Sequence, residues 1–107
     1  MKHIVYIAGP YTQGDQFINV RNTIVAGQEV YDAGGIPVLP LMAAFWHLII
    51  PGPYEQWMEI DLALLERCDA MIRLPGDSPG ADREAMFAAE RGIPVYDSVE
   101  AWISKED

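Results

Sequence analysis

The order in which short apolar runs alternate with longer segments constrains this fold more than any other feature. Residues 4–8 form a β-rich, nearly all-apolar run that ends at a Gly-Pro pair, as a strand buried on both faces does. Similar runs follow at 36–39, 70–74 and 93–96. The connections between them are too long for hairpins, so right-handed crossovers and a parallel sheet are expected. We therefore predict a small doubly wound α/β fold of the Rossmann/flavodoxin type, with about four strands and helices on both faces.

The segments between these runs predict helices. Asp15 is a good N-cap for a helix that extends to residue 33, where a Gly-Gly pair ends it. Apolar residues occur at helical spacings along this segment: Phe17, Val20, Ile24 and Tyr31. A second helix is predicted over 54–67 from a broad apolar face: Tyr54, Trp57, Met58, Leu62, Leu64 and Leu65.

The remaining segments are shorter. Residues 41–50 are compatible with a short helix or a structured loop. Residues 75–80 predict a loop that leads into a helix over 81–91, and Ser98 is expected to cap a terminal helix that reaches about residue 103. The helix over 81–91 offers a face of small residues for close packing: Ala81, Ala85, Ala88 and Ala89.

Composition narrows the classes of function. The 107 residues, half of them hydrophobic, predict a single domain, and the net charge of −9 disfavours nucleic acid polymers and anionic membrane surfaces as partners. The longest apolar stretch, 41–50, is about half the length of a membrane-spanning helix. Cys68 is the only cysteine and the two histidines are far apart in sequence, so neither a disulfide nor a metal site is expected. A cytoplasmic location is the default expectation.

Two glycines five residues apart, Gly9 and Gly14, lie between the first strand and helix and suggest a phosphate loop. Such a loop needs Lys and then Ser or Thr after the second glycine, whereas Asp15 and Gln16 follow here. The three-glycine dinucleotide pattern is also absent. We therefore expect no triphosphate hydrolysis and no cofactor.

Ligands of doubly wound folds bind beyond the carboxyl ends of the strands, so the loops after residues 8 and 74 should share one rim. In the second loop Ser78 is placed to cap a helix whose first position suits Pro79. Ser78 either caps this helix only or also helps to bind an anion at its N-terminus. Gly80 serves the turn or leaves room for a ligand.

Two carboxylates on this rim stand out because apolar positions flank them. Glu84 borders the small-residue face of its helix, and Asp61 lies within the apolar face of the preceding helix. A solvated glutamate is the ordinary alternative for Glu84. Burial of a carboxylate is costly without a hydrogen-bond partner, so a partner or ligand is expected, and such a pair suggests acid–base or glycosyl chemistry.

Aromatic residues could stack on a heterocycle, although core packing is their more common role. The candidates are Tyr6, Trp46 and Trp57, and His47 is a candidate for contact with a base. Cys68 is expected to be a small buried hydrophobic residue.

Several short motifs, in order and spacing, resemble the nucleoside 2-deoxyribosyltransferase superfamily, and most closely its small bacterial and phage-type members. The resemblance extends from about residue 5 to 95. It rests on Tyr6-Ile7-Ala8-Gly9-Pro10, on Asp61-Leu62 with Cys68-Asp69, on Ser78-Pro79-Gly80-Ala81-Asp82-Arg83-Glu84 and on Gly92-Ile93-Pro94-Val95.

This resemblance implies that Glu84 attacks the anomeric carbon of a nucleoside or nucleotide and forms a covalent glycosyl-enzyme. Asp61 would position the sugar or assist the leaving base, and Tyr6, which matches the family tyrosine at the end of the first strand, is the third catalytic candidate. The serine at position 78 is similar to that of nucleoside 5′-monophosphate N-glycosidases, which favours hydrolysis over base transfer. Those hydrolases hold phosphate with an arginine in the first loop, which is missing here, and Arg83 is the candidate substitute.

The resemblance also implies a homodimer or larger homo-oligomer, and we expect exposed Trp and Phe side chains between Phe45 and Trp57 at its interface. Together with the residues named above, the predicted substrate site includes Gly9, Pro10, Gly80, His47 and Trp57. Two other functions remain open. The chain could be a catalytically silent module that binds or senses a nucleotide, or a structural oligomer with a vestigial cleft.

Overall fold

The computed structural model describes residues 2–105. Its four strands form one all-parallel sheet in the order β2-β1-β3-β4, which confirms the predicted class of fold. Residues Val5 and Ala70 pair in the central ladder between β1 and β3. The strands are β1 (Ile4–Ala8), β2 (Ile36–Val38), β3 (Ala70–Arg73) and β4 (Val95–Tyr96).

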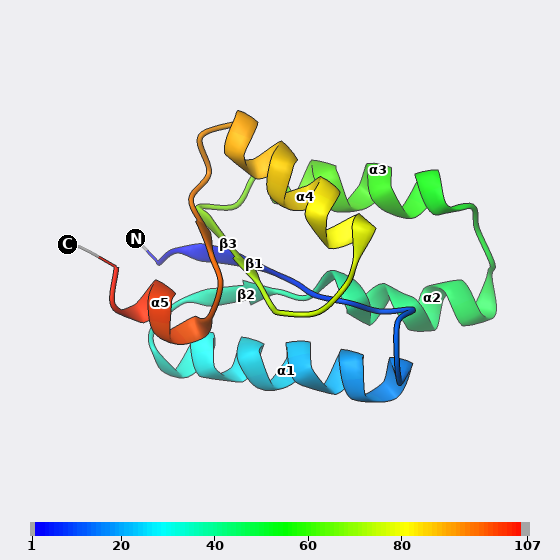
Figure 1. Ribbon diagram of the computed structural model, residues 1–107, viewed down its shortest axis with the longest axis horizontal. Coiled ribbons are helices and arrows are strands. Elements are labelled where there is room, and N and C mark those ends of the chain that lie inside the picture. Colours follow the sequence, from blue (N-terminus) through cyan, green and yellow to red (C-terminus); the bar gives the residue numbers. More distant parts are fainter. Residues whose placement is uncertain (1, 106–107) are drawn as a thin grey trace.

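Helices cover both faces of the sheet. Figure 1 shows α1 and α5 on one side of the strands and α3 and α4 on the other. The chain connects the strands through α1 (Gln16–Asp32), the 3-10 turn η1 (Pro40–Ala43), α2 (Ala44–Ile49), α3 (Tyr54–Leu65) and α4 (Pro79–Glu90), and ends with α5 (Val99–Ile103). None of the helices in residues 2–105 has both the length and the apolar character needed to span a bilayer.

The central strand β1 contributes to a separate apolar cluster on each face. Val5 and Ile7 pack with residues of α1 and α5, whereas Tyr6 and Ala8 pack with residues of α3 and α4. This division follows from the two-residue period of a strand, which turns successive side chains to opposite faces. The phenol of Tyr6 is therefore held beneath α3 and α4.

The buried face of α1 differs from the one that apolar spacing suggests. Phe17 is 81% exposed and Tyr31 is 61% exposed, and Ile24 is also exposed. The residues of α1 that are buried are mostly small: Thr23, Ala26, Gly27 and Val30. A Cβ on Gly27 would lie 2.9 Å from Leu39 Cδ2, so α1 approaches the end of β2 too closely for larger side chains on this face.

Local signals placed the helix ends well. Asp15 Oδ1 accepts a hydrogen bond from Ile18 N at the start of α1, and Ser78 and Ser98 cap α4 and α5 in the same way. The structure begins α4 at Pro79, so the predicted loop over 75–80 is shorter, because Pro79 fits the first helical turn. The ambiguous segment 41–50 is mostly helical, as η1 followed by α2.

The direction of the crossovers reverses between β1 and β3, the two central strands. From β1 the chain crosses to β2 at one end of the strand order, whereas from β3 it crosses to β4 at the opposite end. The loops that follow β1 and β3 touch, because a Cβ on Gly76 would lie 2.7 Å from Pro10 Cγ. This reversal opens a crevice at the carboxyl ends of the strands.

Candidate functional site

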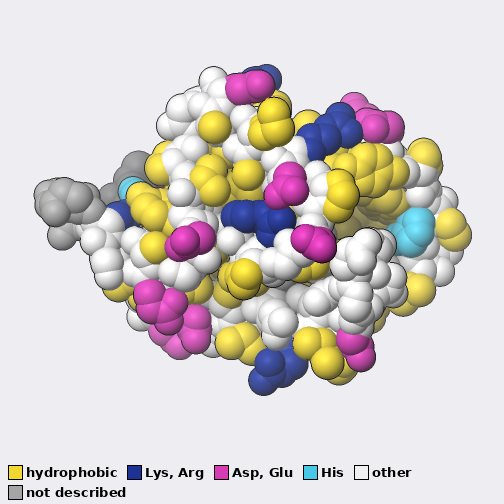
Figure 2. All heavy atoms as spheres, viewed as in Figure 1, with side chains coloured by type: hydrophobic (Ala, Val, Ile, Leu, Met, Phe, Trp, Pro, Cys, Tyr) yellow, Lys and Arg dark blue, Asp and Glu magenta, His cyan; other side chains and the backbone are white. Residues whose placement is uncertain are grey.

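A cavity of about 520 Å³ lies at this crevice, on the face of the sheet that α3 and α4 cover. Figure 2 shows hydrophobic side chains gathered around a hollow on the part of the surface near α2 and α3. The volume is within the usual range for small-molecule sites. The lining residues come from the carboxyl ends of β1 and β2 and from α2, α3 and α4: Ala8, Gly9, Tyr11, Thr12, Pro40, Leu41, Ala43, Ala44, His47, Gly52, Tyr54, Trp57, Met58, Asp61, Ser78, Pro79, Gly80, Ala81 and Glu84.

Glu84 reaches the cavity because of its position on α4. It lies three residues after Ala81 and four before Ala88, both of which are buried, so it shares their helix face. Its side chain is only 6% exposed. Tyr6 Oη donates a hydrogen bond of 3.2 Å to Glu84 Oε2.

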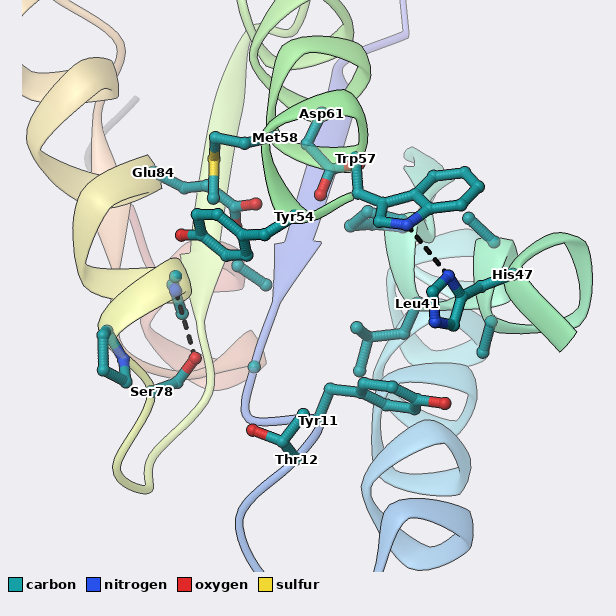
Figure 3. Close-up of a pocket in the computed structure, with 18 of the residues that line it drawn as sticks. Tyr11, Thr12, Leu41, His47, Tyr54, Trp57, Met58, Asp61, Ser78 and Glu84 are labelled. Atoms are coloured by element: carbon teal, nitrogen blue, oxygen red, sulfur yellow. Dashed lines mark hydrogen bonds between the residues drawn. The ribbon is translucent and has the colours of Figure 1, made fainter. Parts of the chain in front are cut away.

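Asp61 faces Glu84 from α3, as Figure 3 shows. It lies three residues after Met58 and four before Leu65, both buried, so the apolar face of α3 carries this carboxylate inward. The predicted pair of carboxyl groups on one rim is thus brought together in the structure.

Burial dominates the electrostatics of the pair. Burial, the charge of Asp61 and a hydrogen bond with Asp61 raise the pKa of Glu84 to about 8, although the Tyr6 hydroxyl and the charge of Arg73 act in the opposite direction. Burial also raises the pKa of Asp61 to about 6, against a hydrogen bond with Glu84 that lowers it. The two groups therefore hold one proton between them near neutral pH.

Tyr6 supports the pair from below without lining the cavity. Its side chain is fully buried, and burial followed by the charge of Glu84 raises the pKa of the phenol far above its usual range. The hydroxyl is therefore a permanent hydrogen-bond donor to the carboxyl group of Glu84. It fixes the position of one Glu84 oxygen.

The start of α4 forms the wall of the cavity next to the carboxyl pair. Ser78 Oγ accepts a hydrogen bond of 3.1 Å from Ala81 N, and Ser78 and Gly80 both line the cavity. A Cβ on Gly80 would make ordinary contacts with Tyr54 Oη and Met58 Cε, at 3.6 and 3.7 Å. The absence of a side chain at Gly80 thus leaves room at the wall.

The far end of the cavity is aromatic. Trp57 Nε1 donates a hydrogen bond of 3.0 Å to His47 Nδ1 and another of 3.1 Å to Gly52 O (Figure 3 shows the first). Trp46 packs edge-on against Trp57 at a centroid distance of 5.0 Å and does not line the cavity. Of the two tryptophans that were candidates for stacking on a ligand, Trp57 lines the cavity and Trp46 does not.

Two predicted substrate residues lie outside this cavity. Arg83 is exposed and forms an ion pair of 3.0 Å with Glu55, with its guanidinium 6.0 Å from the ring centroid of Tyr54. Pro10 packs toward Gly76 and lines a separate cavity on the opposite face of the sheet. Gly9, in contrast, is buried at the end of β1 and lines the site.

Sequence reasoning missed the part of the lining that follows β2. Leu41, Ala43 and Ala44 lie there, and Tyr54 and Gly52 complete that side of the cavity. The rule that placed the loops after β1 and β3 applies equally to the loop after β2, and would have found these residues. Cys68 is buried as predicted, and burial raises the pKa of its thiol to about 11.

Comparison with known proteins adds one match. A model of a protein family described as a domain of unknown function (DUF4406) matches residues 3–97. This match includes every residue of the candidate site. No curated protein matches the chain.

Proposed function

The chain belongs to the DUF4406 family of domains of unknown function, and from the geometry of its site we propose that it is an N-glycosidase that cleaves the base–sugar bond of a nucleoside. The observation that carries the proposal is the pair formed by the buried Glu84 and the half-buried Asp61 at one end of a cavity of ligand size. The sequence resemblance to nucleoside 2-deoxyribosyltransferases supports the same chemistry.

Glu84 and Asp61 together hold the one proton that the reaction needs. When the shared proton moves to Asp61, Glu84 becomes a carboxylate whose oxygen attacks the anomeric carbon. The bond between this carbon and the base nitrogen breaks, the electron pair leaves with the base, and Asp61 supplies the proton. A sugar ester of Glu84 and a free base result.

Hydrolysis then restores the site. Asp61, now a carboxylate, removes a proton from a water molecule that attacks the same carbon, and the ester bond to Glu84 breaks. Tyr6 donates its hydrogen bond to Glu84 throughout and stabilises the carboxylate when it leaves the sugar. Transfer to a second base would use the same intermediate.

The charge of the lining favours a nucleoside over a nucleotide. Both charged side chains that line the cavity, Asp61 and Glu84, are carboxyl groups. These carboxyl groups would repel a negatively charged 5′-phosphate, whereas they would not repel a neutral nucleoside. The nearest arginines are paired elsewhere, Arg73 with Asp82 and Arg83 with Glu55.

Base release tests the proposal. The wild-type protein is expected to release free base from one or more of a panel of ribo- and deoxyribonucleosides, measured by chromatography. Glu84→Gln should lower the rate by about 10³-fold or more, because the nucleophile is lost. Glu90→Gln is the matched control, since Glu90 is an exposed residue at the end of the same helix.

Mass spectrometry of the wild-type protein after rapid quenching should show the added mass of one sugar on the peptide that contains Glu84. Release of base at equal rates by wild type and Glu84→Gln would exclude the proposed nucleophile. Binding of nucleosides by both proteins without release would instead indicate a silent binding module.

A further inference from the structure

Two N–H groups converge on one nitrogen of His47. Trp57 Nε1 lies 3.0 Å and Gly52 N lies 3.2 Å from His47 Nδ1. Both are donors that cannot accept, so Nδ1 must be an acceptor without a proton. This hydrogen-bond pattern assigns the ring proton to Nε2.

The residues that hold this tautomer belong to a short and well-connected turn. Gly52 lies between α2, which carries His47, and α3, which carries Trp57. Trp57 Nε1 also donates to Gly52 O at 3.1 Å, so the three residues form a closed network. The rings of His47 and Trp57 pack edge to face at a centroid distance of 5.4 Å. The network therefore fixes the orientation of the imidazole ring as well as its tautomer.

The free nitrogen of His47 faces the site. His47 lines the cavity, and Figure 3 shows its second ring nitrogen on the side of the ring away from Trp57, toward Leu41 and Tyr11. Leu41 and Ala44 give this end of the cavity an apolar wall. His47 is exposed in the free protein, so the discrimination arises when a bound base covers its ring. An N–H donor enclosed between the base and this wall discriminates strongly between an acceptor and a second donor on the ligand.

The position of the carboxyl pair orients a ligand within the cavity. In a nucleoside bound with its anomeric carbon at Glu84, the base must extend along the cavity from that carbon. Figure 3 shows α4 with Ser78 on one side of the cavity and His47 with Trp57 across from it. The flat indole and the apolar wall match a heterocycle, whereas the polar start of α4 matches the hydroxyl groups of a sugar.

From this arrangement we propose that His47 is the specificity-determining residue of the site, and that its Nε2–H selects bases that present a carbonyl oxygen over those that present an amino group. This inference rests on the proposed function for the orientation of the ligand. The favoured substrate class is the oxo-base nucleosides, such as inosine and uridine. Adenosine and cytidine place an N–H donor where their oxo counterparts have an acceptor.

Matched nucleoside pairs test the selection. Wild-type protein should favour inosine over adenosine, and uridine over cytidine, by about tenfold or more in kcat/KM, because one unpaired donor costs about that factor. His47→Asn keeps an oxygen that can accept from Trp57 and Gly52, but its side chain is too short to place an N–H at the position of the histidine Nε2–H, so it should reduce these ratios to near one. His3→Asn is the control, because His3 is exposed and precedes β1 at the amino ends of the strands, whereas the cavity lies at their carboxyl ends.

A binding experiment separates this inference from the catalytic proposal. Free hypoxanthine, adenine, uracil and cytosine are titrated by calorimetry into wild-type protein, His47→Asn and His3→Asn. If no nucleoside is cleaved, the proposed function fails, but tighter binding of hypoxanthine and uracil that is lost only in His47→Asn still supports the role of His47. Equal binding of oxo and amino bases by the wild type, or no binding, overturns it.

The tautomer of His47 can be measured directly. Nitrogen-15 NMR of the imidazole side chains should show His47 with an unprotonated Nδ1 and a protonated Nε2, and the His3→Asn spectrum identifies which signals belong to His47. Trp57→Phe removes one of the two donors and should shift the Nδ1 signal, whereas Trp46→Phe should not. A protonated Nδ1 in the wild type would exclude the proposed donor.

Discussion

The site depends on a few side chains whose environment changes their chemistry. Glu84 would be an ordinary surface glutamate on the exposed face of α4, where Glu90 lies. Glu84 instead lies on the inward face of α4, where it is buried against Tyr6 and Asp61 and its pKa is raised. The same amino acid therefore has two roles on one helix, and the difference is set by burial.

This burial makes stability depend on pH. The pKa of Glu84 is about 8 in the folded protein against an ordinary value of 4.5, and Asp61 is raised in the same direction. Between these values the folded state holds a proton that the unfolded chain releases, so the free energy of unfolding falls as pH rises. The contribution of these two groups to stability is therefore complete below the ordinary values of 4.5 and 3.8 and should be lost as the pH rises to about 8.

Glu84→Gln removes most of this dependence because glutamine carries no titrating proton. At pH 8 the variant should unfold at a temperature higher than wild type by about 5 °C or more, and the gap should close near pH 4.5. Thermal unfolding followed by circular dichroism across this pH range measures both curves, with Glu90→Gln as the exposed control. Parallel curves for wild type and Glu84→Gln would mean that Glu84 is not buried in solution.

At the scale of elements, α4 combines a structural signal with a functional position. Ser78 caps the helix, and Glu84 follows within two turns, so the cap determines where the carboxyl group lies. α2 and α3 act similarly, since the turn between them holds the imidazole of His47. In both cases a helix start or a turn places the side chain that faces the cavity.

Ser78→Ala separates capping from ligand binding. Loss of the cap should lower the free energy of unfolding by about 1 kcal/mol, and Ser98→Ala, which uncaps α5, gives the reference for a cap outside the site. Chemical denaturation measures both variants. If Ser78 only caps, base release from nucleosides and from their 5′-monophosphates should fall by the same factor. A selective loss with the monophosphates would show instead that Ser78 binds phosphate.

At the scale of the whole molecule, the two faces of the sheet differ in the side chains that they bury. The face under α1 and α5 is an apolar core, in which Val30 and Trp102 are buried. The face under α3 and α4 carries the cavity and the buried polar groups Tyr6 and Glu84. The buried carboxyl group and phenol thus lie on one face, whereas the other supplies much of the packing and buries only Thr23 and the Nε1 of Trp102 as polar groups of the described residues.

A substitution at Gly35 tests the packing of that core. A Cβ at this position would lie 2.8 Å from both Val30 Cγ1 and Trp102 Cη2, which places side chains of α1 and α5 against the start of β2. Gly35→Ala should therefore lower the free energy of unfolding by about 1–3 kcal/mol in chemical denaturation. Gly80→Ala, whose Cβ has room, should cost nothing in stability. Equal stability of the two variants would contradict the packing of Trp102 against Gly35.

The sequence by itself determined the class of fold, because the signals involved are local. Short apolar runs, an Asp or Ser before each of three helices and a Gly or Pro within two residues after each of the first three strands act over a few residues. The inward positions of Asp61 and Glu84 were also readable, since each shares a helix face with apolar neighbours at three and four residues' distance. The buried face of α1 was not, because it depends on how closely α1 approaches Leu39 at the end of β2.

Only the tertiary structure decided which of the candidate residues meet. Tyr6 and Glu84 are 78 positions apart in sequence, and their hydrogen bond exists because α4 covers the face of the sheet to which the central strand β1 turns Tyr6. The shared proton of Glu84 and Asp61 and the ion pair of Arg83 with Glu55 are likewise products of contacts between α3 and α4. Periodicity fixes the face of an element on which a side chain lies, but distance and burial depend on the packing of elements that are remote in sequence.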